Sequence, residues 1–300
     1  MLNFGNVLII GTGLMGGSLA KALRQRQLVD HVSGFARRRE PLEKGVALGI
    51  LHSVADDLSE AIAAADIIVL GVPTLAVGQY LPIIHQHRQA HCIVTDIASV
   101  KGDVVNAVIK ELGELPAWFV PGHPIAGAEL SGIEASDANL YVHHKVILTP
   151  DGNTDAQALE TIRQLWQAVG AHVVAMSITE HDQVLAATSH LPHALAFVLV
   201  DTLLSLPKKH DVFDFAAGGF RDFSRIASSH PVMWHDIMLA NKSAILDMMA
   251  SYREHFDLLE QLIKNEDSQA ILDLFQRAKE ARDDFTQRLN DRQKGNHEST

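Results

Sequence analysis

Short apolar runs alternate with helical patterns through the first half of the chain. They predict strands at Val7–Ile10, Val32–Phe35, Ile67–Val72, Cys92–Asp96, Lys145–Leu148 and Val173–Met176, and helices at Leu14–Arg26, Leu58–Ala65 and Ala156–Val169. Strands that alternate with helices indicate parallel βαβ units in a doubly wound sheet. The strand runs are apolar at successive positions, which is typical of strands covered by helices on both faces.

The pattern changes near Ser177, beyond which only helical periodicity remains. Helices are predicted at Met233–Ala250 and Ser268–Leu289, and the polar tail Asp291–Thr300 is expected to fray. The expected fold class is therefore α/β. A Rossmann-like dinucleotide-binding domain would span residues 1–176, and an all-helical substrate and dimerisation domain residues 177–300. Long apolar helix faces favour a homodimer, although a dimer surface and an internal core look alike in sequence.

Composition narrows the class of protein. The chain has 300 residues, of which 47% are hydrophobic and 20% charged, and its net charge of −11 argues against a nucleic-acid partner. No basic segment precedes the apolar run Val7–Ile10, and no segment reaches the roughly 18 apolar residues of a membrane span. Cys92 is the only cysteine, so no intrachain disulfide is possible, which fits a reducing cytoplasm.

A glycine-rich turn follows the first predicted strand. It reads Gly11-Thr12-Gly13-Leu14-Met15-Gly16 and opens the first helix, which is the G-x-G-x-x-G arrangement of a dinucleotide site. Gly11 permits the tight turn, Gly13 lets the backbone approach a pyrophosphate, and Gly16 lets helix pack on strand. The amide groups of the helix N-terminus would then face the phosphates. The alternative is a glycine-rich turn without a ligand.

The end of the second strand bears on the choice of cofactor. A site for NAD usually has Asp or Glu near Ala36, but Arg37, Arg38 and Arg39 follow instead. Arginines can bind a 2′-phosphate, so NADP is favoured and NAD remains possible. The alternative is a solvated basic turn that tolerates either cofactor. Val72 and Pro73, after the next strand, are expected to line the adenosine and pyrophosphate side.

Two polar segments fall at the carboxyl ends of strands, where open α/β sheets bind ligands. In the first, Ser99 is placed to hydrogen-bond a substrate hydroxyl and to contact the cofactor. Lys101 is placed to bind cofactor or a carboxylate, or to sit in the first turn of the next helix. In the second, His123 lies in a Gly- and Pro-rich loop with Glu129 close behind. His123 suits proton transfer near neutral pH, the alternative being a structural loop histidine.

The helical half adds two candidate groups. His190 and His193 lie three residues apart, but no cysteine cluster or carboxylate pair accompanies them, so no metal is expected. Arg221 follows the flexible pair Gly218-Gly219 and is a candidate clamp for a substrate carboxylate. Without the other motifs, a surface pair of Arg221 with Asp222 would be the simpler interpretation.

Taken together, five ordered motifs closely resemble the prephenate/arogenate dehydrogenase family. They are G-x-G-L-x-G-G-S at Gly11–Ser18, D-x-x-S-V-K-G at Asp96–Gly102, G-H-P-I-A-G-x-E-x-S-G at Gly122–Gly132, S-H-L-P-H at Ser189–His193 and G-G-F-R-D-F-x-R-I at Gly218–Ile226. The resemblance runs from Val7 to about Lys242. It implies oxidative decarboxylation of prephenate to 4-hydroxyphenylpyruvate, or of arogenate to tyrosine, with hydride transfer to NAD(P).

The resemblance also implies roles for single residues on a substrate with two carboxylates. His123 would be the base at the ring hydroxyl, assisted by Ser99. Arg221 would bind a substrate carboxylate, and Glu129 would gate or compete for that arginine. His193 would lie near the side chain of the substrate, where prephenate and arogenate differ.

Two other classes of protein remain as alternatives. One is a β-hydroxyacid dehydrogenase or imine reductase with the same domain order. Those enzymes usually place a catalytic lysine on the helix after the domain junction, and Thr179–Ser189 contains none. The other is a non-catalytic sensor that binds NADP, in which the chemical residues would be dispensable.

Overall fold

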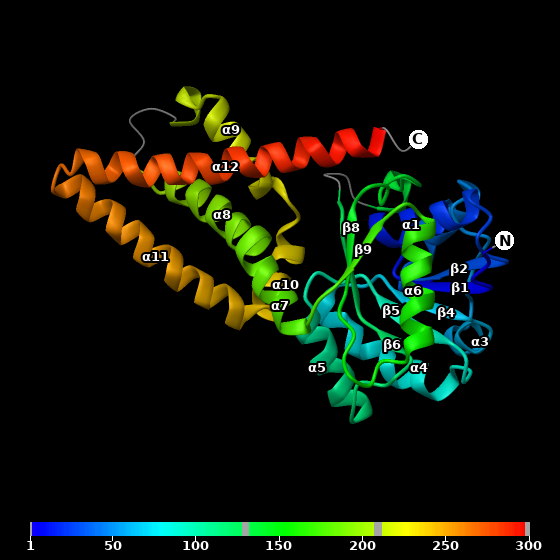
Figure 1. Ribbon diagram of the computed structural model, residues 1–300. Helices are drawn as coiled ribbons and strands as arrows, with labels where there is room; N and C mark the ends of the chain where they lie inside the picture. Colours follow the sequence, from blue (N-terminus) through cyan, green and yellow to red (C-terminus); the bar gives the residue numbers. More distant parts are fainter. Residues whose placement is uncertain (1, 128–131, 207–211, 298–300) are drawn as a thin grey trace. The chain divides into compact units, whose positions relative to one another are not determined.

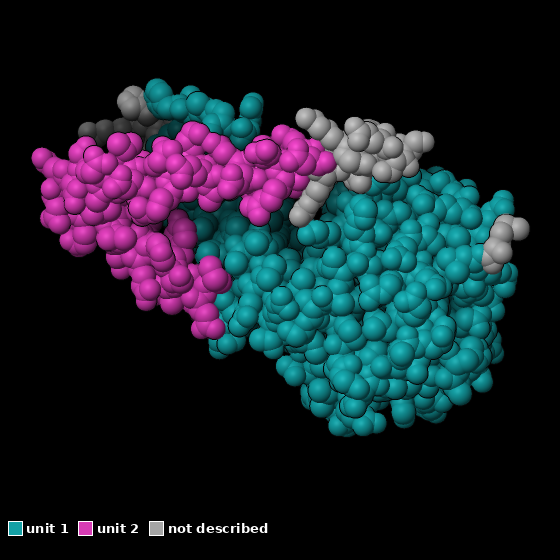
Figure 2. Space-filling view, viewed as in Figure 1, with its two compact units in different colours: residues 1–245 teal, residues 246–300 magenta. Residues whose placement is uncertain are grey.

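The computed structural model describes residues 2–127, 132–206 and 212–297 (Figure 1). The chain forms two compact units, residues 1–245 and residues 246–300 (Figure 2). This division lies later in the chain than the junction expected after Met176. The assignment of residues 1–176 and 177–300 to separate functional domains therefore stays a prediction.

A six-stranded sheet forms the centre of the first unit. Its strands are β1 (Asn6–Ile10), β2 (His31–Phe35), β3 (Ser53–Val54), β4 (Ile67–Leu70), β5 (Ile93–Asp96) and β6 (Phe119–Val120). Their order is β3-β2-β1-β4-β5-β6, and every neighbouring pair is parallel. The expected Rossmann-like, doubly wound class is confirmed.

Helices cover both faces of this sheet. The first face carries α1 (Leu14–Gln25), α2 (Arg39–Ala47) and α6 (Ala156–Ala168), and the second carries α3 (Leu58–Ala63), α4 (Leu81–His87) and α5 (Lys101–Leu112). Successive residues of β1 point to opposite faces, so Val7 and Ile9 join one apolar core while Leu8 and Ile10 join the other. This explains why the strand runs are apolar at every position.

A second, three-stranded sheet departs from the expected pattern. It contains β7 (Gly122–Ile125), β8 (Lys145–Leu148) and β9 (His172–Ala175), with β7 and β8 antiparallel and β8 and β9 parallel. The sequence placed β8 and β9 in the doubly wound sheet, which is wrong. It also placed His123 in a loop, whereas His123 lies on β7 opposite Ile147. Pairing in a sheet fixes the direction of its side chain more firmly than a loop would.

A continuous helical run follows β9 and packs against α5. It comprises α7 (Ile178–Leu185), one π-helical turn (Ala186–His190) and α8 (Leu191–Leu204). Pro192 lacks an amide donor, which disturbs the regular ladder where the π turn lies. Among the described residues this run alone is long and apolar enough to pass for a membrane span, with a mean hydropathy of 1.4. It carries the buried His181 and the half-buried Asp182 near its beginning.

The remaining helices correct two sequence expectations. They are α9 (Gly218–Ser224), α10 (Pro231–Ala240), α11 (Lys242–Lys264) and α12 (Ser268–His297). The single helix expected at Met233–Ala250 is interrupted at Asn241, because the buried side chain of Asn241 donates hydrogen bonds to Asp182 and His190. The tail expected to fray from Asp291 is helical as far as His297.

Candidate active site

The turn between β1 and α1 has the geometry of a phosphate cradle. Gly11 adopts a φ of +96°, and a Cβ atom there would lie 2.5 Å from the carbonyl oxygen of Gly71. A Cβ atom on Gly16 would lie 2.5 Å from the carbonyl oxygen of Gly11, so close packing of helix on strand requires glycine. A Cβ atom on Gly13 would meet no protein atom within 4 Å. Gly13 therefore faces open space above the turn.

The N-terminus of α1 is free to bind an anion. Gly13 caps the helix and provides no side-chain acceptor for the amides of the first turn. These amides and the helix dipole suit a pyrophosphate, so the residues present fit a dinucleotide. Around the turn, Thr12 is buried while Leu14 and Met15 are half-buried.

Other expected cofactor residues follow neighbouring strands. Val72 and Pro73 come directly after β4, which pairs with β1. Ala36 follows β2 and is half-buried, while Arg37 and Arg38 are exposed and make no hydrogen bond or ion pair with the described residues. Arg39 differs, because it pairs with Glu43 and Asp56. Arg37 and Arg38 are thus exposed cations directly after the half-buried Ala36.

A buried ion pair joins the β5–α5 loop to β7. Lys101 and Asp96 are both fully buried and paired, and Lys101 Nζ also donates to the carbonyl oxygen of Gly122 at 2.6 Å. Asp96 Oδ1 accepts from the Gly122 amide at 3.1 Å. Burial lowers the pKa of Lys101, and Asp96 opposes this effect. Lys101 therefore fixes the strand that carries His123. It lies in the first turn of α5, which is one of the two places that the sequence left open for it, and its buried ammonium is not exposed to bind substrate or cofactor, which was the other.

His123 is held as a neutral imidazole in this frame. It is 8% exposed, and burial lowers its pKa well below 6.5, helped by the nearby His181, Lys101 and His190. A neutral ring can accept a proton, as a general base must. Ser99 lies half-buried in the loop between β5 and α5, the segment clamped to the strand of His123 through Asp96.

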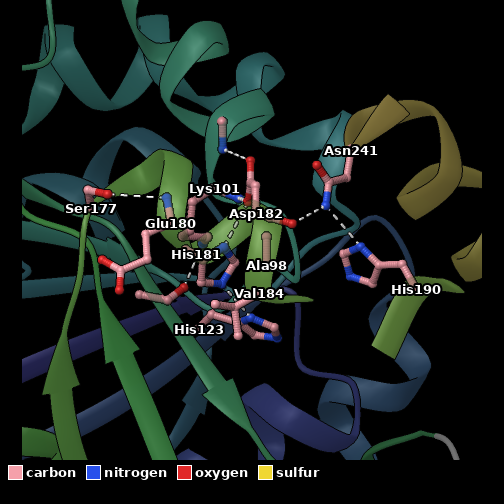
Figure 3. Close-up of polar contacts among 12 residues, drawn as sticks. Ala98, Lys101, His123, Ser177, Glu180, His181, Asp182, Val184, His190 and Asn241 are labelled. Atoms are coloured by element: carbon pink, nitrogen blue, oxygen red, sulfur yellow. Dashed lines mark hydrogen bonds and ion pairs between the residues drawn. The ribbon is translucent and has the colours of Figure 1, made fainter. Parts of the chain in front are cut away.

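A partner of His123, His181, and the carboxylate that in turn pairs with His181 were both missed from the sequence. His123 Nδ1 lies 2.9 Å from His181 Nε2, and His181 Nδ1 lies 2.7 Å from Asp182 Oδ1 (Figure 3). Asp182 Oδ1 accepts from the Lys101 amide at 2.9 Å, and Oδ2 from the Gly102 amide at 2.8 Å. The sequence offered no distinct signal, because His181 and Asp182 lie within the polar run Thr179–Gln183 at the start of α7.

The expected histidine pair divides into two environments. His190 is buried and accepts from Asn241 Nδ2 at 3.0 Å, while burial lowers its pKa to about 4. His193 is half-buried, stacks on Trp234 with 3.6 Å between ring centroids, and donates from Nδ1 to the Ser189 carbonyl at 2.9 Å. The two rings thus have different hydrogen-bond partners.

The arginine whose charge acts on His193 is Arg225 rather than Arg221. Arg221 on α9 is 81% exposed, and its Nε lies 3.5 Å from Asp222 Oδ1. Burial lowers the pKa of His193, and the charge of Arg225 lowers it further. Arg225 begins a short 3₁₀ helix (Arg225–Ser228) that contacts α8, the helix of His193. Glu129 lies outside the described residues.

Known families match both halves of the chain. A family model described as the nucleotide-binding domain of prephenate dehydrogenase matches residues 19–175. A second model, described as the dimerization domain of prephenate dehydrogenase, matches residues 177–277. The two matches follow one another in order.

Individual relatives agree. The chain is 35% identical to the cyclohexadienyl dehydrogenase of Zymomonas mobilis over 94% of this chain and 96% of the relative. It is 35% identical to the prephenate dehydrogenase of Bacillus subtilis, over 92% of this chain and 75% of that relative.

Solved structures give the same result. The prephenate dehydrogenase of Aquifex aeolicus, solved with hydroxyphenyl propionate and NAD+, is 38% identical to this chain and superposes with a TM-score of 0.88. The match covers 94% of this chain and 98% of the Aquifex chain. The arogenate dehydrogenase of Synechocystis is 30% identical with a TM-score of 0.80, and the match covers 93% of this chain and 99% of the Synechocystis chain. This chain therefore belongs to the prephenate dehydrogenase family and is a nicotinamide-dependent dehydrogenase.

Proposed function

We propose that this protein oxidatively decarboxylates prephenate, or its amino analogue arogenate, in tyrosine biosynthesis. The observation that carries the proposal is a buried, neutral His123 on a strand that Asp96 and Lys101 clamp to the carboxyl end of β5. The glycine-rich turn follows β1 at the same edge of the sheet. A proton acceptor and a dinucleotide cradle at one edge are the two parts that this reaction needs.

The chain supplies proton removal and orientation. His123 takes the proton of the ring hydroxyl, and the C–H bond at the same carbon breaks as its electron pair leaves as hydride. A nicotinamide cofactor held over the glycine-rich turn would supply the acceptor for that hydride. The C–C bond to the ring carboxylate would then break, CO2 would leave, and the electron pair of that bond would make the ring aromatic as a phenolate. His123 would return its proton to the phenolate oxygen. Ser99 hydrogen-bonds the hydroxyl and orients it toward His123.

An absorbance assay at 340 nm with prephenate and arogenate, each with NAD and with NADP, tests this proposal. We expect turnover with at least one substrate, and a preference for NADP because Arg37 and Arg38 are unpaired and exposed. A preference for NAD would instead indicate that these arginines belong to a solvated basic turn and do not bind a 2′-phosphate. Folded protein that binds cofactor yet turns over neither substrate would contradict the proposed reaction.

We further propose that Arg225, rather than Arg221, binds a substrate carboxylate. Arg225→Ala is expected to raise the KM for substrate by about 10- to 100-fold, because a charged hydrogen bond contributes about 1.5–3 kcal/mol. Arg221→Ala, on the same segment, is the matched control and should raise KM less than threefold. The affinity for cofactor, measured by fluorescence titration, should change in neither variant. The reverse order of the two effects would restore Arg221 as the clamp.

The buried state of His123 predicts the pH dependence. Burial lowers the pKa of His123 well below 6.5, so the ring stays neutral, and able to accept a proton, when an exposed imidazole would already be charged. The acid limb of log kcat/KM against pH should therefore lie below pH 6.5, the ordinary pKa of an exposed imidazole. An acid limb centred above pH 6.5 would mean that another group controls the rate.

We propose a homodimer formed through the helical segments, in the cytoplasm. Large apolar side chains are exposed on several of these helices: Val198, Val232, Met233, Leu239, Tyr252, Phe256, Ile263, Leu272 and Phe275. Uncovered apolar surface of this extent is typical of a protein interface. Light scattering should give about twice the chain mass of 32.8 kDa.

A further inference from the structure

A chain of hydrogen bonds runs from the N-terminus of α5 through Asp182 and His181 to His123. It begins at the N-terminus of α5, where the amides of Lys101 and Gly102 hold the Asp182 carboxylate. Burial alone would raise the pKa of Asp182, but the bonds from His181 and these two amides outweigh burial and lower it. Asp182 is therefore an ionised carboxylate, which a helix N-terminus stabilises.

The charge of Asp182 determines which nitrogen of His181 carries a proton. A carboxylate can only accept, so the 2.7 Å contact requires His181 Nδ1 to donate. His181 is completely buried, and burial lowers its pKa although Asp182 opposes this effect. The ring is therefore neutral, and its Nε2 holds a lone pair.

The tautomer of His181 determines which nitrogen of His123 carries a proton. His181 Nε2 can only accept, so His123 Nδ1 must donate across the 2.9 Å contact. A neutral imidazole has one N–H group, so His123 Nε2 is left with the lone pair. The geometry thus leaves His123 with a free acceptor at Nε2, the atom that a general base needs.

We propose that His181 is a positioning residue which, held by Asp182, locks His123 in the Nδ1–H tautomer, so that the two rings act as one base. The proposal rests on the proposed role of His123 as proton acceptor. When His123 Nε2 takes the hydroxyl proton, the Nδ1 proton can move to His181 Nε2. The positive charge then lies beside the Asp182 carboxylate, and no further proton transfer is required.

A proton that enters the pair before substrate would block it. With His181 charged, its Nε2–H donates to His123 Nδ1, and the His123 proton resides on Nε2, facing the substrate. The groups that face the pair are Lys101, His190, Asp182 and Asp96. Lys101 and His190 disfavour this extra proton, whereas Asp182 and Asp96 favour it.

The first test is a measurement of the tautomer without turnover. Long-range ¹⁵N–¹H spectra of the unliganded protein, with His123 assigned by comparison with His123→Asn, distinguish Nδ1–H from Nε2–H. We expect Nδ1–H in the wild type and in His181→Gln, whose amide oxygen can still accept. We expect a mixture in His181→Leu. His190→Gln removes an equally buried imidazole and should leave the His123 tautomer unchanged.

Kinetics give the second test. His181→Leu should lower kcat by about 10²-fold with KM within threefold, and His181→Gln, which preserves the tautomer but cannot take the proton, should recover only part of that loss. An Nε2–H tautomer in the wild type, or an unchanged tautomer in His181→Leu, would overturn the lock whatever the activity. A confirmed lock in a protein that does not turn over either substrate would instead count against the proposed function. The wild-type spectrum decides even if His181→Leu fails to fold.

Discussion

His123→Asn is expected to lower kcat by about 10²- to 10⁴-fold, the range that general acid–base catalysis contributes. Asparagine places an amide near the position of Nδ1 and can still donate to His181 Nε2, but it has no atom at the position of Nε2. The substitution therefore removes the proton acceptor while it preserves the buried contact. A single-turnover measurement of cofactor reduction would show the loss in the chemical step.

The control for this variant is His172→Asn, which replaces an exposed histidine on β9. It should retain the wild-type kcat. The affinity for cofactor should be the same in both variants, because His123 lies on β7 and the dinucleotide cradle follows β1. A His123→Asn variant within twofold of the wild-type kcat would remove His123 from the base role.

The sequence predicted the elements whose signals are local. The glycine-rich turn lies between a continuous apolar run and a helix, so both its position and its function could be predicted from the sequence. Four strands of the central sheet, β1, β2, β4 and β5, followed from the same alternation of strands and helices, whereas the two-residue strands β3 and β6 were not predicted. The second sheet could not be predicted, because nothing local distinguishes a strand that pairs with β5 from one that pairs with β7.

The residues of the candidate active site could be predicted from the sequence only in part. His123 and Ser99 stood out because they lie in unusual polar segments at the ends of strands. His181 and Asp182 did not, since their importance comes from contacts across 58 and 80 residues of chain. Lys101 was expected either to bind a ligand or to sit in the first turn of the next helix, and only the contacts of its side chain with Asp96 and Gly122 decide between the two. Pair distances of this kind are set by packing, which one sequence does not reveal.

The second large effect is expected at the cofactor cradle, where Gly13→Val should abolish cofactor binding without unfolding the protein. The backbone of Gly13 has a φ of −74°, which valine tolerates, and a Cβ atom there meets no protein atom within 4 Å. The space that valine would fill is the space through which a pyrophosphate approaches the amides of α1. We expect at least a 100-fold loss of cofactor affinity in a fluorescence titration and an unchanged melting temperature.

Two further substitutions separate this effect from simple crowding. Gly16→Val forces a Cβ atom to within 2.5 Å of the Gly11 carbonyl oxygen, so it should lower the melting temperature as well as cofactor affinity. Gly152→Val also meets no protein atom within 4 Å but lies in an exposed turn, so it should change neither quantity. If Gly13→Val bound cofactor as tightly as Gly152→Val, the pyrophosphate could not lie over this turn. The glycine motif would then serve only the packing of α1 on β1.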